Sequence, residues 1–158
     1  MVELLRVDER LLHGQVATTW TNAIAPEAIL VANDEAAKNE MSRLALKMAK
    51  PAGVKLAIKT VEDGIALLNN PRSKGIKIFV IVRTIHDALT LVQHTDQIRK
   101  VNVGGVKKKE GGKMVAAGIF LTQEEIDDLK EMRTCVDEVE LRMVPSEAKH
   151  DINKILNE

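Results

Sequence analysis

The chain has very few aromatic residues and a single cysteine. Aromatic residues make up 2% of the 158 residues, with one Trp, two Phe and no Tyr. That is too few for the stacking surfaces on which single-stranded nucleic acids bind. Cys135 has no second cysteine for a disulfide bond within the chain, and a lone cysteine usually behaves as a small hydrophobic residue. We therefore expect a reducing, cytoplasmic environment.

The chain also lacks an excess of charge and a long apolar segment. Lys plus Arg and Asp plus Glu are equal at 23 each, so no overall positive field attracts nucleic acid. No apolar run reaches about 18 residues, the length that spans a bilayer, and the N-terminus has no signal-peptide pattern. We expect no nucleic-acid partner and no membrane span, and any anion must bind at a local site.

Strand-like runs alternate with helical patterns along the whole chain, which is typical of βαβ units. We therefore predict a doubly wound α/β fold: a mostly parallel sheet of about seven strands with helices on both faces. No linker or internal repeat divides residues 1–158, so we expect one domain. The predicted strands are Val2–Val7, Ala28–Ala32, Val54–Lys59, Ile76–Val82, Ile98–Val103, Met114–Leu121 and Val136–Val144.

Helices are predicted from capping patterns and from apolar periodicity. Three segments begin with Thr-x-x-acid, in which the two side chains cap a helix start. These pairs are Thr60 and Asp63, Thr84 and Asp87, and Thr122 and Glu125. Two segments repeat apolar residues at i, i+3, i+4 and i+7, which predicts one buried stripe in each. The stripes are Met41, Leu44, Ala45 and Met48, and Ile85, Ala88, Leu89 and Val92. A first helix is marked by Val16, Trp20 and Ile24, and its Trp is expected to pack in the core.

The first strand leads into a loop that packs two Arg, two acidic residues and a His before a helix. Ligands of open parallel sheets bind beyond the carboxyl ends of the strands. A neutral imidazole is a competent nucleophile near pH 7 and forms a covalent N–P bond, so His13 is a candidate phosphoryl acceptor. Phosphoryl transfer needs charge stabilisation that guanidinium groups supply, and Arg6 and Arg10 are the candidates. The alternative without a function is that His13 caps a helix or is solvated, and that the Arg and Asp residues form surface ion pairs that contribute little to stability.

Three further residues of the loop complete this candidate site. Gly14 lets a phosphate approach the backbone, and the N-terminus of the following helix offers N–H donors. Gln15 belongs to the same segment. Asp8 has two interpretations: it bonds to a ring nitrogen of His13 and fixes the tautomer, or it pairs with Arg10 and holds it.

Residues 6–16, Arg-x-Asp-x-Arg-Leu-x-His-Gly-Gln-Val, followed by Trp20, resemble the IIB components of the mannose–sorbose family of the bacterial sugar phosphotransferase system. Residues 31–35, 101–105 and 144–145 extend the similarity over nearly the whole chain. The resemblance implies a single IIB domain over residues 1–158.

In that family this His is phosphorylated by a IIA protein and discharged onto a sugar that enters through membrane IIC and IID subunits. The resemblance therefore implies that His13 carries the phosphoryl group in a phosphotransferase enzyme. It also implies that Arg10, three residues earlier, holds that group. The sugar is expected to be a hexose or an amino sugar. The protein is expected in the cytoplasm, peripherally associated with the membrane transporter, and the family is compatible with a homodimer.

Residues from other strand ends join the prediction. In the family that the chain resembles, an Asn-x-Gly-rich loop follows the fifth strand, so the resemblance implies that Asn102, Gly104 and Gly105 lie near His13 across the switch point of the sheet, unless the glycines only form a tight turn. Arg83 either faces the site or is a solvated strand-end charge. Asp34 either belongs to the site or only caps a helix.

We expect no metal and no cofactor. His86, His94 and His150 lack metal-ligand spacing. The lysine- and glycine-rich segment 107–113 departs from the phosphate-binding P-loop pattern. That segment either meets an acidic partner or membrane headgroups or is a solvated loop.

Two other functions remain open from the residues alone. One is a non-catalytic regulator that binds an anion or a nucleotide on a flavodoxin-like sheet. The other is a structural subunit whose first helix and basic loop only dock a partner. Stable phosphoryl label on His13 would separate both from a phosphohistidine carrier.

Overall fold

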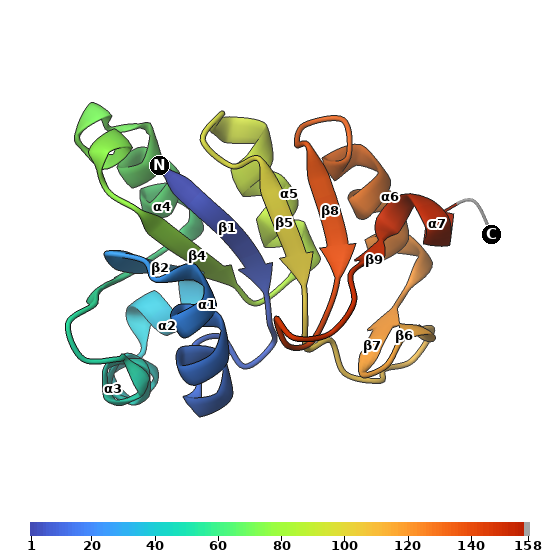
Figure 1. The fold of residues 1–158 in the computed structure, drawn as a ribbon, viewed down its shortest axis with the longest axis horizontal. Helices are drawn as coiled ribbons and strands as arrows, with labels where there is room; N and C mark the ends of the chain where they lie inside the picture. Colours follow the sequence, from blue (N-terminus) through green and yellow to red (C-terminus); the bar gives the residue numbers. More distant parts are fainter. Residues whose placement is uncertain (157–158) are drawn as a thin grey trace.

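A computed structural model describes residues 1–156, and it has the predicted α/β fold (Figure 1). The main sheet has seven strands in the order β3-β2-β4-β1-β5-β8-β9, and only β9 runs antiparallel to its neighbour. The strands are β1 (Val2–Val7), β2 (Ala28–Ala32), β3 (Lys55–Lys59), β4 (Ile78–Val82), β5 (Lys100–Val103), β8 (Glu138–Leu141) and β9 (His150–Asp151). Four of them are shorter at their ends than predicted.

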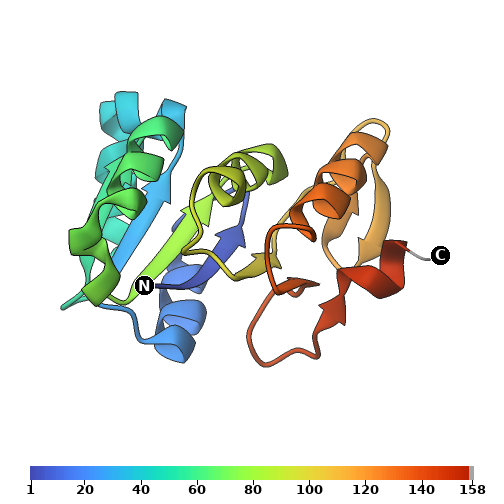
Figure 2. The ribbon, with the colours of Figure 1, turned by 90° about the horizontal axis from the view of Figure 1, so that it is seen from above.

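Helices cover both faces of this sheet, as predicted. Figure 2 shows α4 (Val61–Asn69), α5 (Ile85–His94) and α6 (Gln123–Met132) on one side of the sheet. The other side carries a π-helical turn, η1 (Val16–Trp20), which continues as α1 (Thr21–Ile24). The remaining helical segments are α2 (Asp34–Lys38), α3 (Glu40–Ala49), the 3-10 helix η2 (Pro71–Gly75) and α7 (Ile152–Leu156).

The three predicted helix caps are confirmed. The side chains of Thr60, Thr84 and Thr122 each accept a hydrogen bond from the backbone N–H three residues later. In α6 the carboxylate of Glu125 also accepts from the N–H of Thr122, which completes a capping box. These short-range contacts fix where each helix begins after its strand.

Side chains that alternate along the strands divide the core into two clusters. On the α4–α6 face, Leu5 and Val80 belong to the larger cluster. On the η1–α1 face, Phe79 and Ile81 pack with Trp20, which is buried as expected. Arg6 lies between two residues of the larger cluster in β1, so its side chain points to the η1–α1 face.

The predicted strand Met114–Leu121 is wrong as a member of the main sheet. The segment forms a separate antiparallel hairpin of β6 (Lys113–Ala116) and β7 (Ile119–Leu121). Gly118 reverses the chain with a φ of 76°, a backbone conformation that glycine adopts without steric cost. A turn inside the apolar run therefore splits it into two strands.

The buried stripe predicted for α3 is also wrong. Met41, Leu44 and Met48 are 82%, 59% and 79% exposed, whereas Leu46 is buried. Ala36 of the preceding helix α2 is fully buried, and α2 packs against the edge strand β3. Since α2 covers that part of the sheet, α3 contacts the core only through the side that carries Leu46.

Candidate active site

The loop after β1 lies at the carboxyl edge of the sheet, between the ends of β4 and β5 (Figure 1). The N–H of Asp8 donates to the carbonyl of Val82 at 2.9 Å, and the N–H of Glu9 donates to the carbonyl of Gly105 at 3.0 Å. The start of the loop is therefore attached to both neighbouring strand ends, at the edge where ligands of parallel sheets bind.

Two leucines anchor the loop before His13. Leu11 and Leu12 are 1% and 3% exposed, and the N–H of Leu11 donates to the carbonyl of Asp8 at 2.9 Å. Leu11 has a φ of 56°, a left-handed conformation that is uncommon outside glycine and recurs at functional sites. These contacts give His13 a defined position, and its side chain is 14% exposed.

Asp8 joins the imidazole to the sheet. It is buried, and its Oδ2 lies 3.3 Å from Nε2 of His13 and accepts a hydrogen bond from Arg6 at 3.0 Å. Its Oδ1 accepts from the backbone N–H of Arg10 at 2.9 Å. Of the two interpretations of Asp8, the geometry favours the one in which it orients His13, because its contact with Arg10 involves the backbone and not the guanidinium.

Arg6 is 1% exposed and is the largest fully buried side chain. Besides Asp8, its guanidinium donates to Oδ1 of Asn102 at 2.5 Å and to the carbonyls of Arg142 and Met143 at 3.2 and 3.1 Å. It also stacks 4.8 Å from the ring centroid of Trp20. Burial lowers the pKa of Arg6, and the adjacent Asp8 carboxylate opposes this shift.

The register of the sheet explains how these residues meet. Arg6 of β1 pairs with Asn102 of β5, which pairs with Glu140 of β8. Residues aligned in this way point to the same face of a sheet, and Nδ2 of Asn102 donates to Oε1 of Glu140 at 2.9 Å. The sequence indicated Asn102 near the loop, but not Glu140, Arg142 or the contact of Trp20 with Arg6. An acidic residue between two apolar ones in a predicted strand, Val139-Glu140-Leu141, was the available signal.

Gly104 allows the Arg6 side chain to approach the backbone closely. Neither Gly104 nor Gly105 is among the glycines with positive φ, so the tight-turn explanation fails. A Cβ at Gly104 would overlap the guanidinium of Arg6, and one at Gly105 would lie 3.4 Å from Oδ1 of Asp8. Gly104 therefore leaves room for the guanidinium of Arg6, whereas a side chain at Gly105 would make an ordinary van der Waals contact with Asp8.

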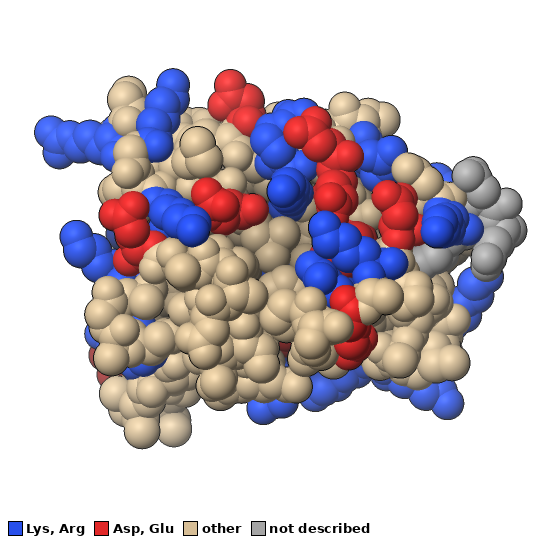
Figure 3. Space-filling model, in the orientation of Figure 1, with Lys and Arg blue, Asp and Glu red and all other residues tan. Residues whose placement is uncertain are grey.

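Other predicted residues form an exposed rim around His13. Arg10, Gly14 and Gln15 are exposed, and within residues 1–156 the Arg10 guanidinium makes no ion pair or hydrogen bond. Residues 11–24 contain no Lys, Arg, Asp or Glu, and Figure 3 shows few charged side chains over the lower left of the molecule, where α1 lies. The Arg10 guanidinium is thus exposed and unpaired among the described residues.

Arg83 and Asp34 lie outside this arrangement. Arg83 follows β4 and forms an ion pair with Glu35 at 3.4 Å. Asp34 follows β2, which is separated from β1 by β4. Its Oδ1 accepts from the backbone N–H of Val61 at 2.9 Å, so it caps α4, whereas Asn33 caps α2.

The sequence profile of the PTS system sorbose subfamily IIB component matches residues 2–158. The chain belongs to this family of phosphotransferase-system IIB components. A probable phosphotransferase enzyme IIB component of Streptococcus pyogenes serotype M6 is 39% identical, covering 99% of this chain and 100% of the relative. The sorbose-specific EIIB component of Klebsiella pneumoniae is 31% identical, covering 99% and 96%.

Solved structures agree with this assignment and show the same α/β fold. The IIB chain superposes on the IIBSor domain of the sorbose permease from Klebsiella pneumoniae with a TM-score of 0.92 at 30% identity, covering 99% of this chain and 96% of that one. It superposes equally well, with a TM-score of 0.92 at 27% identity, on manxB from Thermoanaerobacter tengcongensis, covering 100% and 96%.

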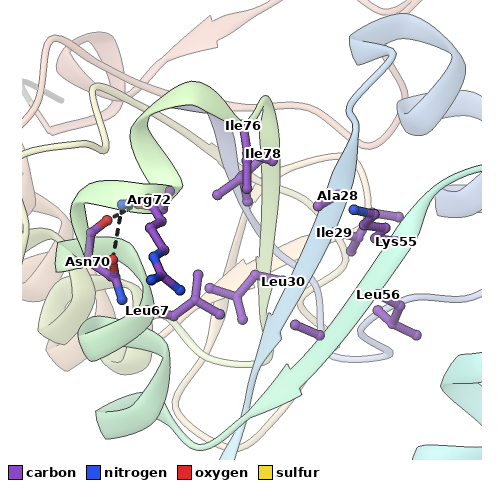
Figure 4. A pocket seen from close by; sticks show the side chains of 12 residues that line it. Ala28, Ile29, Leu30, Lys55, Leu56, Leu67, Asn70, Arg72, Ile76 and Ile78 are labelled. Carbon is purple, nitrogen blue, oxygen red and sulfur yellow. Dashed lines mark hydrogen bonds between the residues drawn. The ribbon is translucent and has the colours of Figure 1, made fainter.

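Two of the cavities in the described residues are relevant to the predicted site residues and to the core. One of about 370 Å³ adjoins the loop and is lined partly by Glu9, Arg83 and Lys107. Another of about 380 Å³ lies toward the amino ends of the central strands, where Leu30 and Leu67 form part of an aliphatic wall (Figure 4). The polar residues that line this cavity are Lys55, Asn70, Arg72 and Ser73.

The basic segment of the IIB chain is partly neutralised. Lys107 and Lys108 are exposed, whereas Lys109 forms an ion pair with Glu125 at 2.7 Å. Within residues 1–156, no three His, Cys, Asp or Glu side chains gather where they could hold a metal ion. In the same part of the chain, no helix is long and apolar enough to cross a membrane.

Proposed function

We propose that the IIB chain is a phosphohistidine carrier that accepts a phosphoryl group on His13 from a IIA protein and donates it to a sugar. The observation that carries this proposal is the 3.3 Å contact between Nε2 of His13 and the buried carboxylate of Asp8. A carboxylate at this nitrogen fixes the neutral tautomer with its proton on Nε2 and leaves the lone pair on Nδ1.

In the first step, the Nδ1 lone pair of His13 attacks the phosphorus of the phosphorylated donor. The bond between phosphorus and the donor breaks, and its electron pair returns to the donor. The ring keeps its Nε2 proton and becomes positively charged, which the facing Asp8 carboxylate stabilises. Arg6 holds that carboxylate in place through their 3.0 Å hydrogen bond.

In the second step, a sugar hydroxyl oxygen attacks the phosphorus, the N–P bond breaks and its electron pair returns to Nδ1. The hydroxyl proton passes to a base or to water. Arg10, three residues before His13 in the same loop, stabilises the charge on the phosphoryl oxygens in both steps. Gly14 and Gln15, exposed beside His13, border the space that the phosphoryl group enters.

The partners follow from the family. We propose that membrane IIC and IID subunits present the sugar, a hexose or an amino sugar, and that the IIB chain works in the cytoplasm beside them. Relatives named for sorbose, fructose and mannose support that range. A mannose-specific EIIAB component of Escherichia coli, of which this chain spans 46%, supports a IIA donor. We further propose that residues 1–158 form a single IIB domain, compatible with a homodimer.

Phosphoryl transfer from a phosphorylated IIA protein tests the proposal. Wild-type protein should gain acid-labile, base-stable label, as expected of an N–P bond, and His13→Gln should gain none. His86→Gln, His94→Gln and His150→Gln are matched controls, since these three histidines are exposed and lie elsewhere. Label that survives in His13→Gln, or is lost in a control variant, would reject His13 as the acceptor.

A further inference from the structure

Glu140 is a buried carboxylate that the proposed chemistry does not use directly. It lies in β8 and is 2% exposed. Its Oε1 accepts from Asn102 at 2.9 Å and from Arg142 at 3.2 Å, and its Oε2 has no hydrogen-bond partner in the described residues. A buried carboxylate with one unsatisfied oxygen lowers the stability of the folded protein. A functional role for the charge would explain why it is kept.

Hydrogen bonds connect Glu140 to the proposed acceptor. Asn102 donates to Glu140 and accepts from Arg6, Arg6 donates to Asp8, and Asp8 contacts Nε2 of His13. Resting on the proposed function, we propose that Glu140 is a positioning residue for phosphoryl transfer. It acts through Asn102 and Arg6 and keeps Asp8 aligned with the imidazole.

The amide of Asn102 is the point at which the carboxylate has its effect. An ionised carboxylate only accepts hydrogen bonds and a guanidinium only donates them. An amide between them therefore has one favourable orientation, with Nδ2 toward Glu140 and Oδ1 toward Arg6, as observed. The reversed amide would place two donors face to face at Arg6 and two acceptors face to face at Glu140.

The opposite side of Arg6 is held by the helix that follows His13. Arg6 and Arg142 lie 4.8 and 5.1 Å from the ring centroid of Trp20. The indole Nε1 donates to the carbonyl of Met143 at 2.9 Å, and the same carbonyl accepts from Arg6. The Arg6 guanidinium therefore has little freedom to move, because Asn102 and Glu140 hold it on one side and Trp20 on the other. The orientation of the Asn102 amide then determines where Arg6 presents its N–H donors to Asp8.

The variant Glu140→Gln tests this role, because glutamine keeps the shape but can donate as well as accept. The control is Glu138→Gln, the same substitution two residues earlier in β8, where the carboxylate is partly exposed and pairs with Lys149 at 2.7 Å. We expect Glu140→Gln to gain label from the IIA donor between about 10-fold and 100-fold more slowly, the scale of misplaced catalytic groups. Glu138→Gln should match the wild type.

Two further measurements separate positioning from general structural support. Nitrogen-15 shifts of the His13 ring in unphosphorylated protein should show the Nε2–H tautomer in wild type and Glu138→Gln, and a mixture in Glu140→Gln. In an Asn102→Ala background, Glu140→Gln should cause almost no further slowing, because the connection is already cut. Equal slowing in both backgrounds, or an unchanged tautomer, would overturn the proposal.

The outcomes remain distinguishable from failure of the proposed function. If the wild type gains no label from the donor, the carrier function fails, whereas the tautomer comparison still tests the link from Glu140 to His13. Thermal melts accompany each variant. If Glu140→Gln does not fold, Glu140→Asp replaces it, and a wild-type rate and tautomer in that shortened side chain would count against the proposal.

Discussion

Arg6, at the end of β1, has 1% of its surface exposed and contacts Asp8, Asn102 and Trp20. Arg10, in the loop after β1, is exposed, and its guanidinium makes no hydrogen bond or ion pair in the described residues. The end of β1 and the loop after it therefore have a buried part, whose side chains contact one another, and an exposed rim. Two arginines that look equivalent in the sequence motif thus have different surroundings: Arg6 is held by buried partners, and Arg10 is exposed, as its proposed role toward the incoming phosphoryl group requires.

The largest expected effect comes from removing the rim arginine. Arg10→Ala should slow both gain and loss of phosphoryl by about 10³-fold, or about 4 kcal/mol of barrier, the scale of arginine clamps on phosphoryl groups. Arg10→Lys should rescue only partly, because lysine keeps the charge but lacks the planar fork. Single-turnover transfer and thermal melts measure rate and stability.

Arg72→Ala is the matched control, since Arg72 is exposed in η2 and lines the aliphatic cavity instead of the loop. It should transfer at the wild-type rate. Arg10→Ala should melt like the wild type because no contact in the described residues is lost. A wild-type rate in folded Arg10→Ala would remove the contrast between the two arginines.

The second largest effect is expected from a substitution that fills the space occupied by the buried Arg6 side chain. Gly104→Ala places a methyl group where the Arg6 guanidinium lies, and Arg6 is buried and held there by its hydrogen bonds. We expect transfer to fall by about 10²-fold, because a displaced Arg6 would move the Asp8 carboxylate that faces His13, with a loss of stability of about 1–3 kcal/mol, as for overpacked interiors.

The control is Gly75→Ala in η2, where a new methyl group would meet no atom within 4 Å. It should leave transfer unchanged. Urea denaturation and single-turnover transfer measure both properties in the two variants. If Gly104→Ala transferred as fast as Gly75→Ala, Arg6 would not need its observed position.

Most of the fold could be predicted because its signals are local. The alternation of strands and helices and the capping pair of Thr84 and Asp87 are written in short stretches of sequence. The hairpin was missed because Gly118 lies inside an apolar run. The exposed stripe that includes Met41 was misjudged because periodicity shows that a helix has two faces but not which one meets the core.

The candidate site likewise has residues that local sequence patterns predict and residues that they do not. Arg6, Asp8, Arg10 and His13 are close in sequence, so one loop could be recognised as a unit. Glu140 could not, because its approach to Arg6 depends on the register of three parallel strands, which no local pattern encodes. The contact of Trp20 with Arg6 was missed for a related reason, since a buried Trp is usually explained by packing alone.

The smallest expected effect concerns the stability of Glu140→Gln as a function of pH. Burial raises the pKa of Glu140 in the folded protein, against the hydrogen bond from Asn102 and the positive charges of Arg142 and Lys149. A raised pKa means that folding favours the protonated form. The resulting stabilisation is complete below the unfolded pKa of Glu, about 4.3, and is lost as pH rises through the folded pKa.

Glutamine stays neutral at every pH, so Glu140→Gln should gain stability relative to the wild type as pH rises through that window. Urea denaturation at about pH 4 and about pH 8 measures the difference, and subtraction removes the titration of groups shared by both proteins. Glu138→Gln, which removes a partly exposed ion pair, should show no such gain. A relative stability that falls with pH would mean that the pair with Arg142 outweighs burial. The expected gain, together with slower transfer, would identify a carboxylate kept for its action on Arg6 at a cost in stability, as is common at functional sites.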